Sequence, residues 1–145
     1  MKIHSSFLGA QEIDPDTIIH FPHGLVGMEE YKDFKLFHEE GKSLVFWLQA
    51  VADEAVSFSL CDPQLMNVDY EIRLSDTDCD TLQLSRPEEV AILVMLNRGD
   101  PAEGEEEELR ANVNGPLLIN VEQRRGLQKV LVRPQRHVLL RALDT

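Results

Sequence analysis

The sequence predicts an all-β, mainly antiparallel fold: a small β-barrel-like single domain with one or two short helices. Three observations lead to this prediction. Short runs rich in β-forming residues recur along the chain, separated by Gly, Pro and Asp. Apolar and polar residues alternate within several runs, most clearly in VSFSL over residues 56–60, which is typical of a strand with one buried face. No segment has the apolar periodicity of an amphipathic helix of three turns, and many short strands with little helix are typical of a barrel or sandwich.

The predicted strands follow one another closely along the chain. They cover residues 2–7, 11–13, 17–21, 34–37, 44–50, 56–61, 70–74, 90–96, 110–113, 116–121 and 127–132. The runs 44–48 and 90–96 are nearly all apolar, which predicts central strands that are covered on both faces. Residues 28–32 and 77–84 are each expected to form a helical turn or two.

Turn-forming residues separate these strands. Asp14, Pro15 and Asp16 predict a turn after the second strand, and Asn114–Pro116 predicts another before the strand at 116–121. The sequence Arg124–Gly126 predicts a hairpin loop in which Gly126 supplies the positive φ. The stretch 100–108, DPAEGEEEE, has no apolar residue beyond Ala102, so we expect an acidic loop there.

Length and charge restrict the class of protein. A chain of 145 residues is expected to form one domain, and its net charge is -12. Residues 1–109 carry 24 acids and seven bases, a net charge of -17, whereas residues 110–145 carry two acids and seven bases, a net charge of +5. This balance argues against direct binding to nucleic acid or to an anionic membrane. It would attract a basic partner.

The cysteines and the N-terminal residues predict a soluble cytoplasmic protein. Cys61 and Cys79 form neither a metal signature nor a disulfide framework, and Cys61 is expected to be a small buried apolar residue. Residues 1–8 do not resemble a signal peptide, and no run of 18 apolar residues exists.

A search for catalytic motifs finds no nucleophile elbow, phosphate-binding loop or dinucleotide-binding glycine pattern. His20 and His23 are close in sequence, but their spacing on a strand-to-loop transition does not favour a shared metal ion. Asp62 and Asp69 with a histidine remain an alternative acid–base set. We favour turn chemistry for Asp62, with its side chain capping its own backbone before Pro63.

Three segments combine apolar side chains with restricted backbone. Residues 19–29, IHFPHGLVGME, form a loop that either closes one end of a barrel or provides a docking surface; physical considerations favour the first. In the segment 46–51, FWLQAV, Trp47 is an interface anchor if it faces solvent. The third segment, 111–120, places a turn before an apolar strand.

Together these segments resemble the family of the bacterial flagellar assembly factor FliW. The matching stretches are residues 19–29, 46–51, 112–120 and 126–128, together with the pairs Asp62–Pro63 and Asp69–Tyr70. The order and spacing of these stretches make the resemblance specific, and it runs from residue 1 to about 132. Met28, Ala50 and Gly115 depart from the usual Phe, Ser and Ala. The resemblance thus divides the chain into a FliW-like β-barrel domain, 1–132, and a C-terminal tail, 133–145.

The resemblance implies a non-enzymatic protein without a cofactor that is a monomer when free. Its implied partners are flagellin and CsrA, a small dimeric RNA-binding protein that represses flagellin translation. Family members bind CsrA away from its RNA surface, so that messenger RNA is released. Flagellin occupies the assembly factor while secretion is blocked. The alternatives are a chaperone of flagellin alone and a small barrel hydrolase that uses Asp62, Asp69 and a histidine.

We predict a docking surface made mainly by the apolar loop. The alternative is that its aromatic residues belong to the core. The predicted partner-binding residues are Phe21, Pro22, Gly24, Leu25, Glu29, Tyr31 and Trp47. A second set is predicted to repel RNA phosphate next to bound CsrA, or else to form a solubilising loop. These residues are Glu103, Glu105, Glu106, Glu107 and Glu108. Such repulsion acts only within about 8 Å at physiological salt.

Overall fold

The computed structural model describes residues 1–6, 8–38, 41, 44–98 and 109–131. The strands are β1 (Lys2–Ser5), β2 (Gly9–Glu12), β3 (Ile19–His20), β4 (Asp33–His38), β5 (Val45–Ala50), β6 (Ser57–Cys61), β7 (Val90–Arg98), β8 (Leu109–Ala111), β9 (Leu117–Asn120) and β10 (Arg125–Gln128). The helices are α1 (Asp76–Leu82) and the 3-10 helices η1 (Pro15–Thr17), η2 (Pro63–Met66) and η3 (Pro87–Glu89).

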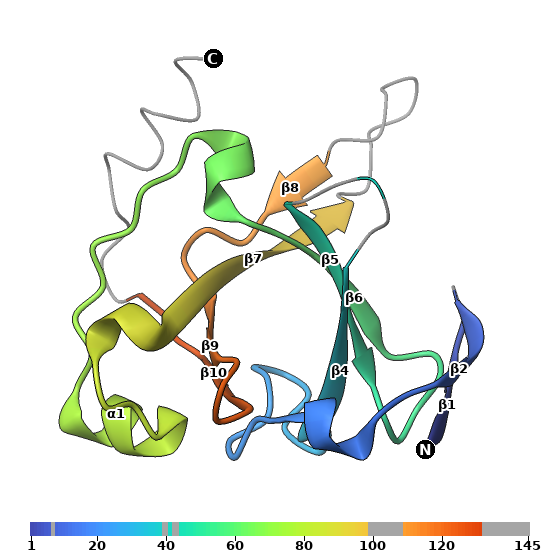
Figure 1. The fold of residues 1–145 in the computed structure, drawn as a ribbon. Helices are drawn as coiled ribbons and strands as arrows, with labels where there is room; N and C mark the ends of the chain where they lie inside the picture. The colour runs from blue at the N-terminus through green and yellow to red at the C-terminus, as the bar shows by residue number, and fades with distance from the viewer. Residues whose placement is uncertain (7, 39–40, 42–43, 99–108, 132–145) are drawn as a thin grey trace, which may run out of the picture.

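Seven strands form a closed barrel (Figure 1). They follow one another in the order β6-β5-β4-β3-β10-β9-β7, and the pairing of β7 with β6 closes the ring. Strand β8 pairs with the far end of β7, and β1 and β2 form a separate hairpin. The pairs are antiparallel except β3 with β10, which are parallel and meet at His20 and Arg125. The structure therefore confirms the predicted mainly antiparallel β-barrel.

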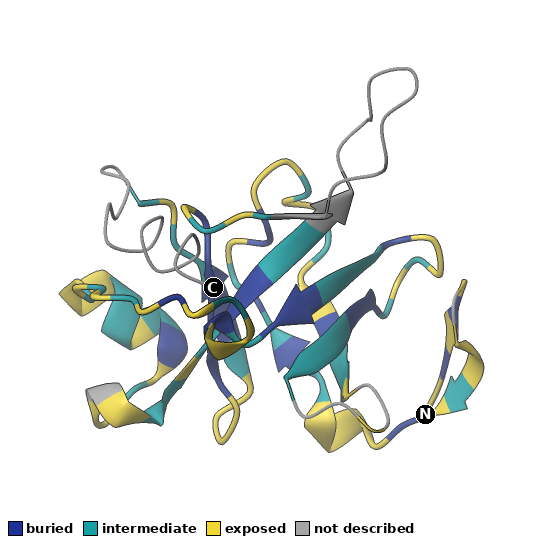
Figure 2. Ribbon diagram, turned by 90° about the horizontal axis from the view of Figure 1, so that it is seen from above, coloured by how far each residue is buried: buried dark blue, intermediate teal, exposed yellow. Residues whose placement is uncertain are grey.

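Alternation along the strands fills the barrel with apolar side chains. The largest cluster of buried residues lines the interior and includes Phe21, Phe34, Leu48, Leu60 and Ile119. Figure 2 shows that buried segments lie where the barrel strands meet, while exposed residues lie mainly in the connections. Burial of apolar area on this scale is the main force that stabilises such a domain. Cys61 is fully buried as a free thiol, as predicted, and burial raises its pKa.

A second apolar cluster lies on the outer face of β9 and β10. It consists of Leu82, Leu118 and Leu127, with Leu118 facing away from its interior neighbours on β9. Helix α1 covers this cluster. Its N-terminus is fixed by a capping box between Ser75 and Asp78, in which each side chain accepts a hydrogen bond from the other residue's backbone.

Two polar contacts hold α1 against the barrel. Lys129, just after β10, forms an ion pair with Asp78. Burial opposes the charged carboxylate, but hydrogen bonds from Lys129 and Ser75 lower the pKa of Asp78 overall. At the other end of α1, the fully buried Asn120 donates from Nδ2 to the Leu82 carbonyl at 2.9 Å. The position of α1 is therefore set by β9 and β10.

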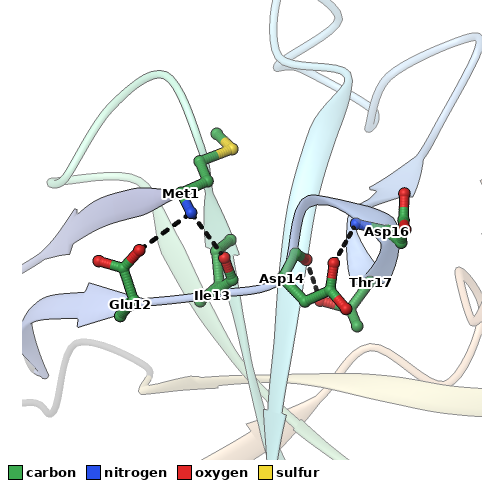
Figure 3. Close-up of polar contacts among 6 residues, drawn as sticks. All are labelled: Met1, Glu12, Ile13, Asp14, Asp16 and Thr17. Atoms are coloured by element: carbon green, nitrogen blue, oxygen red, sulfur yellow. Dashed lines mark hydrogen bonds and ion pairs between the residues drawn. The ribbon is translucent and has the colours of Figure 1, made fainter.

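The N-terminal hairpin ends in a network of local polar contacts (Figure 3). The amino group of Met1 donates to Glu12 Oε1 and to the Ile13 carbonyl, both at 3.0 Å. The predicted turn after β2 is confirmed as η1, where Asp14 Oδ1 accepts from the backbone N–H of Asp16 at 2.9 Å. This contact caps the short helix.

Three local predictions were wrong. Residues 70–74 are not a strand, although burial alternates along them, because the edges of β7 are already paired with β6, β8 and β9. Residues 28–32 form turns, not a helix, and follow Gly27, whose φ is +82°. In the β9–β10 hairpin the positive φ belongs to Arg124, at 56°, and not to Gly126. Gly126 is needed for space, since a Cβ there would lie 2.5 Å from Cζ of Phe21.

Among the described residues, no helix is long and apolar enough to cross a membrane.

Candidate partner-binding surface

The loop after β3 folds through consecutive tight turns, and its light-blue trace lies at the lower end of the barrel (Figure 1). The N–H of Gly24 donates to the Phe21 carbonyl and that of Met28 to the Leu25 carbonyl, each at 2.9 Å. Gly24 has a φ of +67°, and a Cβ there would lie 2.6 Å from Cα of Glu29. Only glycine fits this turn without strain.

The loop divides its apolar side chains between the interior and the surface. Phe21 is fully buried, with its ring edge-on to Phe34 at a centroid distance of 5.4 Å, and Leu25 is 2% exposed. This part of the loop closes the barrel, as physical considerations favoured. Val26 is the second residue of the Leu25–Met28 turn and is 65% exposed. At this exposure the side chain of Val26 buries little apolar area, so it contributes little to the stability of the fold.

Around Val26 the protein has two shallow hollows, of about 410 and 170 Å³, which share Leu25, Val26 and Gln128. We call the larger hollow the Val26 surface. It is lined by Leu25, Val26, Met28, Phe58, Met95, Asn112, Asn114, Gly115, Gln128 and Val130. Val130 is 59% exposed and adds a second uncovered valine. Apolar side chains with a few amides around them are typical of a protein-binding surface.

Gln128 fixes the shape of this surface. Its Oε1 accepts from the backbone N–H of Val26, and its Nε2 donates to the Gly115 carbonyl, both at 3.0 Å. The side chain of one residue on β10 therefore joins the loop after β3 to the turn before β9. These contacts bring together three of the sequence segments that carry the resemblance described above.

The structure distributes the predicted partner-binding residues over several places. Pro22 is half-buried, and Glu29 is exposed, with Oε1 accepting from the N–H of Gly27 at 3.1 Å. Tyr31 donates from its hydroxyl to Asp53 at 2.9 Å, and this hydrogen bond raises the pKa of Tyr31.

Trp47 is half-buried on the outer face of β5. Its neighbours Phe46 and Leu48 pack with the interior cluster instead. Of the predicted set, Gly24, Leu25 and Glu29 line the hollows at Val26, whereas Tyr31 and Trp47 line neither of them.

The predicted electrostatic residues lie outside the described part of the chain. These are Glu103, Glu105, Glu106, Glu107 and Glu108.

Sequence reasoning missed the far side of the Val26 surface. Phe58 and Met95 come from β6 and β7, and Val130 follows β10. The available signal was the resemblance at residues 112–120 and 126–128, which did not place these segments beside the loop.

Among the residues of the alternative hydrolase, Asp62 and the two neighbouring histidines each have a partner of their own. Asp62 Oδ1 accepts from the N–H of Gln64 at 2.9 Å and caps η2, which confirms the turn chemistry predicted for it. His20 contacts Asp33 at 2.8 Å and His23 approaches Thr81 at 3.5 Å, so the two histidines have different partners. In the part of the chain that the structure describes, no three His, Cys, Asp or Glu side chains gather as metal ligands would.

The chain is similar to flagellar assembly factors in both sequence and structure. The family model described as "FliW protein" matches residues 2–141. A flagellar assembly factor FliW from Azoarcus sp. (strain BH72) is 44% identical over 143 residues, covering 97% of this chain and 98% of that protein. A namesake from Chromobacterium violaceum is 40% identical over 89% of this chain and 92% of its own. A crystal structure of the flagellar assembly factor FliW superimposes with a TM-score of 0.80 at 32% identity, covering 93% of this chain and 92% of that one.

Proposed function

Because the chain belongs to the FliW family of flagellar assembly factors, we propose that it binds flagellin and the translational regulator CsrA and thereby antagonises CsrA. Binding of this protein to CsrA releases flagellin messenger RNA for translation. Free flagellin competes for the protein and so restores repression. In this function the protein acts in the cytoplasm, uses no cofactor and catalyses no reaction.

The observation that carries the binding proposal is the Val26 surface. Val26 and Val130 are 65% and 59% exposed, and they line one hollow together with Met28, Phe58 and Met95. Exposed apolar side chains around a preformed hollow favour protein recognition. The hydrogen bonds of Gln128 hold the surface in one shape before binding, which lowers the entropic cost of association.

Competition between the two partners has a thermodynamic consequence. If flagellin weakens binding of CsrA by a given factor, CsrA must weaken binding of flagellin by the same factor. Reciprocity holds whether the partners share the Val26 surface or bind at separate places. Measuring both directions therefore tests the proposed antagonism without knowledge of the second binding site.

The experiment compares the affinities of the wild-type protein and of Val26→Asp and Val130→Asp for flagellin and for CsrA of the same bacterium. Removal of a central apolar contact is expected to weaken binding of at least one partner by about tenfold or more. Val121→Asp is the matched control, because Val121 is also 59% exposed but lies in the β9–β10 hairpin loop. Equal affinities for all four proteins would refute the Val26 surface. Failure of the wild-type protein to bind either partner would refute the function.

Two alternatives make different predictions in the same assays. A chaperone of flagellin alone would bind flagellin but not CsrA. A hydrolase would turn over a small substrate and lose that activity in Asp62→Asn or Asp69→Asn. The capping hydrogen bond that Asp62 already accepts favours the binding function over the hydrolase.

The acidic residues Glu103 and Glu105–Glu108 remain a separate proposal, in which their charge repels RNA from bound CsrA. Replacing these glutamates by Gln should slow RNA release, most clearly at low salt, since salt screens the repulsion. Unchanged release at low and high salt would exclude this role.

A further inference from the structure

The turn before β9 places an Asn–Gly pair, Asn114 and Gly115, on the Val26 surface. It is part of the orange trace that joins β8 to β9 (Figure 1). The chain contains five asparagines, Asn67, Asn97, Asn112, Asn114 and Asn120. Only Asn114 is followed by glycine. In asparagine deamidation the main-chain nitrogen of the following residue attacks the side-chain amide carbon, and glycine has no Cβ to obstruct this approach. Asn114 is therefore the asparagine of this chain whose neighbour least hinders the reaction.

The local structure leaves both reacting groups accessible. Asn114 is exposed, and its side-chain amide makes no hydrogen bond to the described residues. Gly115 lies in neither a helix nor a strand, so its nitrogen is not held in a regular ladder. The N–H of Gly115 donates to the Asn112 carbonyl at 3.4 Å, which is long for a hydrogen bond. Loss of the proton from this nitrogen, which must precede the attack, therefore breaks only a weak contact.

The reaction consumes only water. The nitrogen of Gly115 loses its proton to solvent and forms a bond to Cγ of Asn114. The bond between Cγ and Nδ2 breaks, and Nδ2 leaves as ammonia after it takes up a proton, so that a five-membered succinimide remains. Water then adds to one of the two ring carbonyl carbons and breaks its bond to nitrogen. Attack at Cγ gives aspartate, whereas attack at the main-chain carbonyl carbon gives isoaspartate, and both products carry a carboxylate at neutral pH.

Either product changes the charge of the Val26 surface. None of the ten residues that line this surface is charged. A carboxylate at position 114 is therefore the first charge among them. A partner that covers the surface would have to remove water from this carboxylate without supplying a matching charge, which costs free energy.

Isoaspartate also changes the shape of the surface. At present the Asn114 carbonyl accepts from the N–H of Leu131 at 2.8 Å, and the Gly115 carbonyl accepts from Nε2 of Gln128 at 3.0 Å. In isoaspartate the main chain runs through Cβ and is one atom longer, and the carbonyl that Leu131 contacts becomes a side carboxylate. The two contacts cannot both keep their present geometry. Because Oε1 of Gln128 also accepts from the N–H of Val26, the change extends to the loop after β3.

We propose that Asn114 is a site of spontaneous deamidation, which weakens binding at the Val26 surface as the protein ages. The modification itself is independent of the proposed binding of flagellin and CsrA, whereas its effect on binding rests on that proposed function. Asn112 provides an internal control. It is also exposed and lines the same surface, but the branched side chain of Val113 obstructs the corresponding attack.

The first experiment measures the modification. The full-length protein is incubated in native buffer at neutral and mildly alkaline pH, digested, and analysed by mass spectrometry with enzymatic methyl labelling of isoaspartate. Asn114 is expected to react at least about tenfold faster than Asn112, and faster at the higher pH because the nitrogen of Gly115 must lose its proton. Asn114→Gln should remove the signal, since a glutamine would have to close a six-membered ring. Equal rates at Asn112 and Asn114, or reaction of Asn114 only in urea, would overturn the proposal.

The second experiment measures the effect on binding. Modified wild-type protein, separated from unmodified protein by anion exchange, is compared with fresh protein for its affinity to flagellin and to CsrA. It should bind the partner that Val26→Asp binds poorly at least about tenfold more weakly than fresh protein does. Fresh and aged samples of Asn114→Gln should have the same affinity as each other. Fluorescence of Trp47 verifies that every sample is folded.

Two outcomes of the binding measurement differ in what they refute. If fresh and modified wild-type protein bind with equal affinity, the effect of the modification on the Val26 surface is refuted, although the proposed function stands. If fresh protein binds neither partner, the proposed function is refuted together with that effect. The digest decides the modification of Asn114 in both cases.

Discussion

The contact between Phe21 and Gly126 allows a quantitative test of how the barrel end is built. Phe21 is fully buried, and a Cβ on Gly126 would lie 2.5 Å from its Cζ and 2.6 Å from its Cε2. Real Cβ atoms do not approach other atoms so closely, so the ring or strand β10 must move when Gly126 becomes Ala. The φ of Gly126 is not in the left-handed region, and alanine therefore meets no backbone strain there. The effect of Gly126→Ala comes from the ring alone.

Overpacking of a buried contact costs about 1–3 kcal/mol. With a urea m-value of about 2 kcal/mol/M, the unfolding midpoint of Gly126→Ala should fall by about 0.5–1.5 M. Phe21→Leu alone removes ring atoms from the core and should cost about 1–2 kcal/mol. In the double variant the smaller leucine leaves room for the new methyl group. The two costs should therefore not add, and the coupling free energy should reach about 1 kcal/mol or more.

Urea unfolding of the four proteins, followed by fluorescence of the single tryptophan, Trp47, measures this coupling. An unchanged m-value would show that the midpoint shifts report the stability of the native state. Additive costs within about 0.3–0.5 kcal/mol would show that Phe21 and Gly126 do not interact as argued. A neutral Gly126→Ala would show that the barrel end adapts without strain.

Three further predictions concern buried polar contacts. Asp78→Asn should lower the free energy of unfolding by about 1 kcal/mol at neutral pH. Because the folded-state pKa of Asp78 lies below 3.8, this difference should persist above pH 3.8 and vanish as the pH falls through the lower folded-state value, as measured by urea unfolding against pH. Gln49→Glu should cost about 3 kcal/mol or more at pH 7 and partly recover at pH 4, because Nε2 of Gln49 now donates to the carbonyls of Ala50 and Asp53 at 3.1 and 2.9 Å. Asn120→Ala should cost about 1–3 kcal/mol and weaken amide-exchange protection in α1, whose Leu82 carbonyl loses its donor.

The fold class was predictable because alternation and turn residues report directly on the backbone. The strand prediction for residues 70–74 failed because alternating burial occurs there without strand pairing. Over residues 70–74 the side chains of Tyr70, Ile72 and Leu74 are half-buried and those of Glu71 and Arg73 exposed, which is the burial expected of a strand. Alternation, however, reports which face is covered and not whether a neighbouring strand has a free edge. Partner availability is a property of the whole barrel and cannot be read from a local pattern.

The candidate site was only partly predictable for a related reason. The sequence identifies the loop after β3 as apolar and constrained, but whether Leu25 or Val26 faces solvent depends on the backbone at Gly24 and Gly27, which have φ values of +67° and +82°. The interior position of Phe21 depends on the space left by Gly126, more than 100 residues away in the chain. Contacts of this kind arise only when the barrel closes.

Strand β10 connects the Val26 surface with the face of the barrel that α1 covers. Gly126 and Gln128 face the barrel end, where Gly126 makes room for Phe21 and Gln128 holds Val26 and the turn before β9. Leu127 and Lys129 face the other way, toward Leu82 and Asp78 of α1. Because side chains alternate along a strand, a shift of register by one residue would exchange these two sets. The tight β9–β10 hairpin, in which Arg125 pairs with Asn120, opposes such a shift. The loop 121–124 of this hairpin, by fixing the register, therefore fixes the geometry of the Val26 surface on one side of β10 and of the α1 contact on the other.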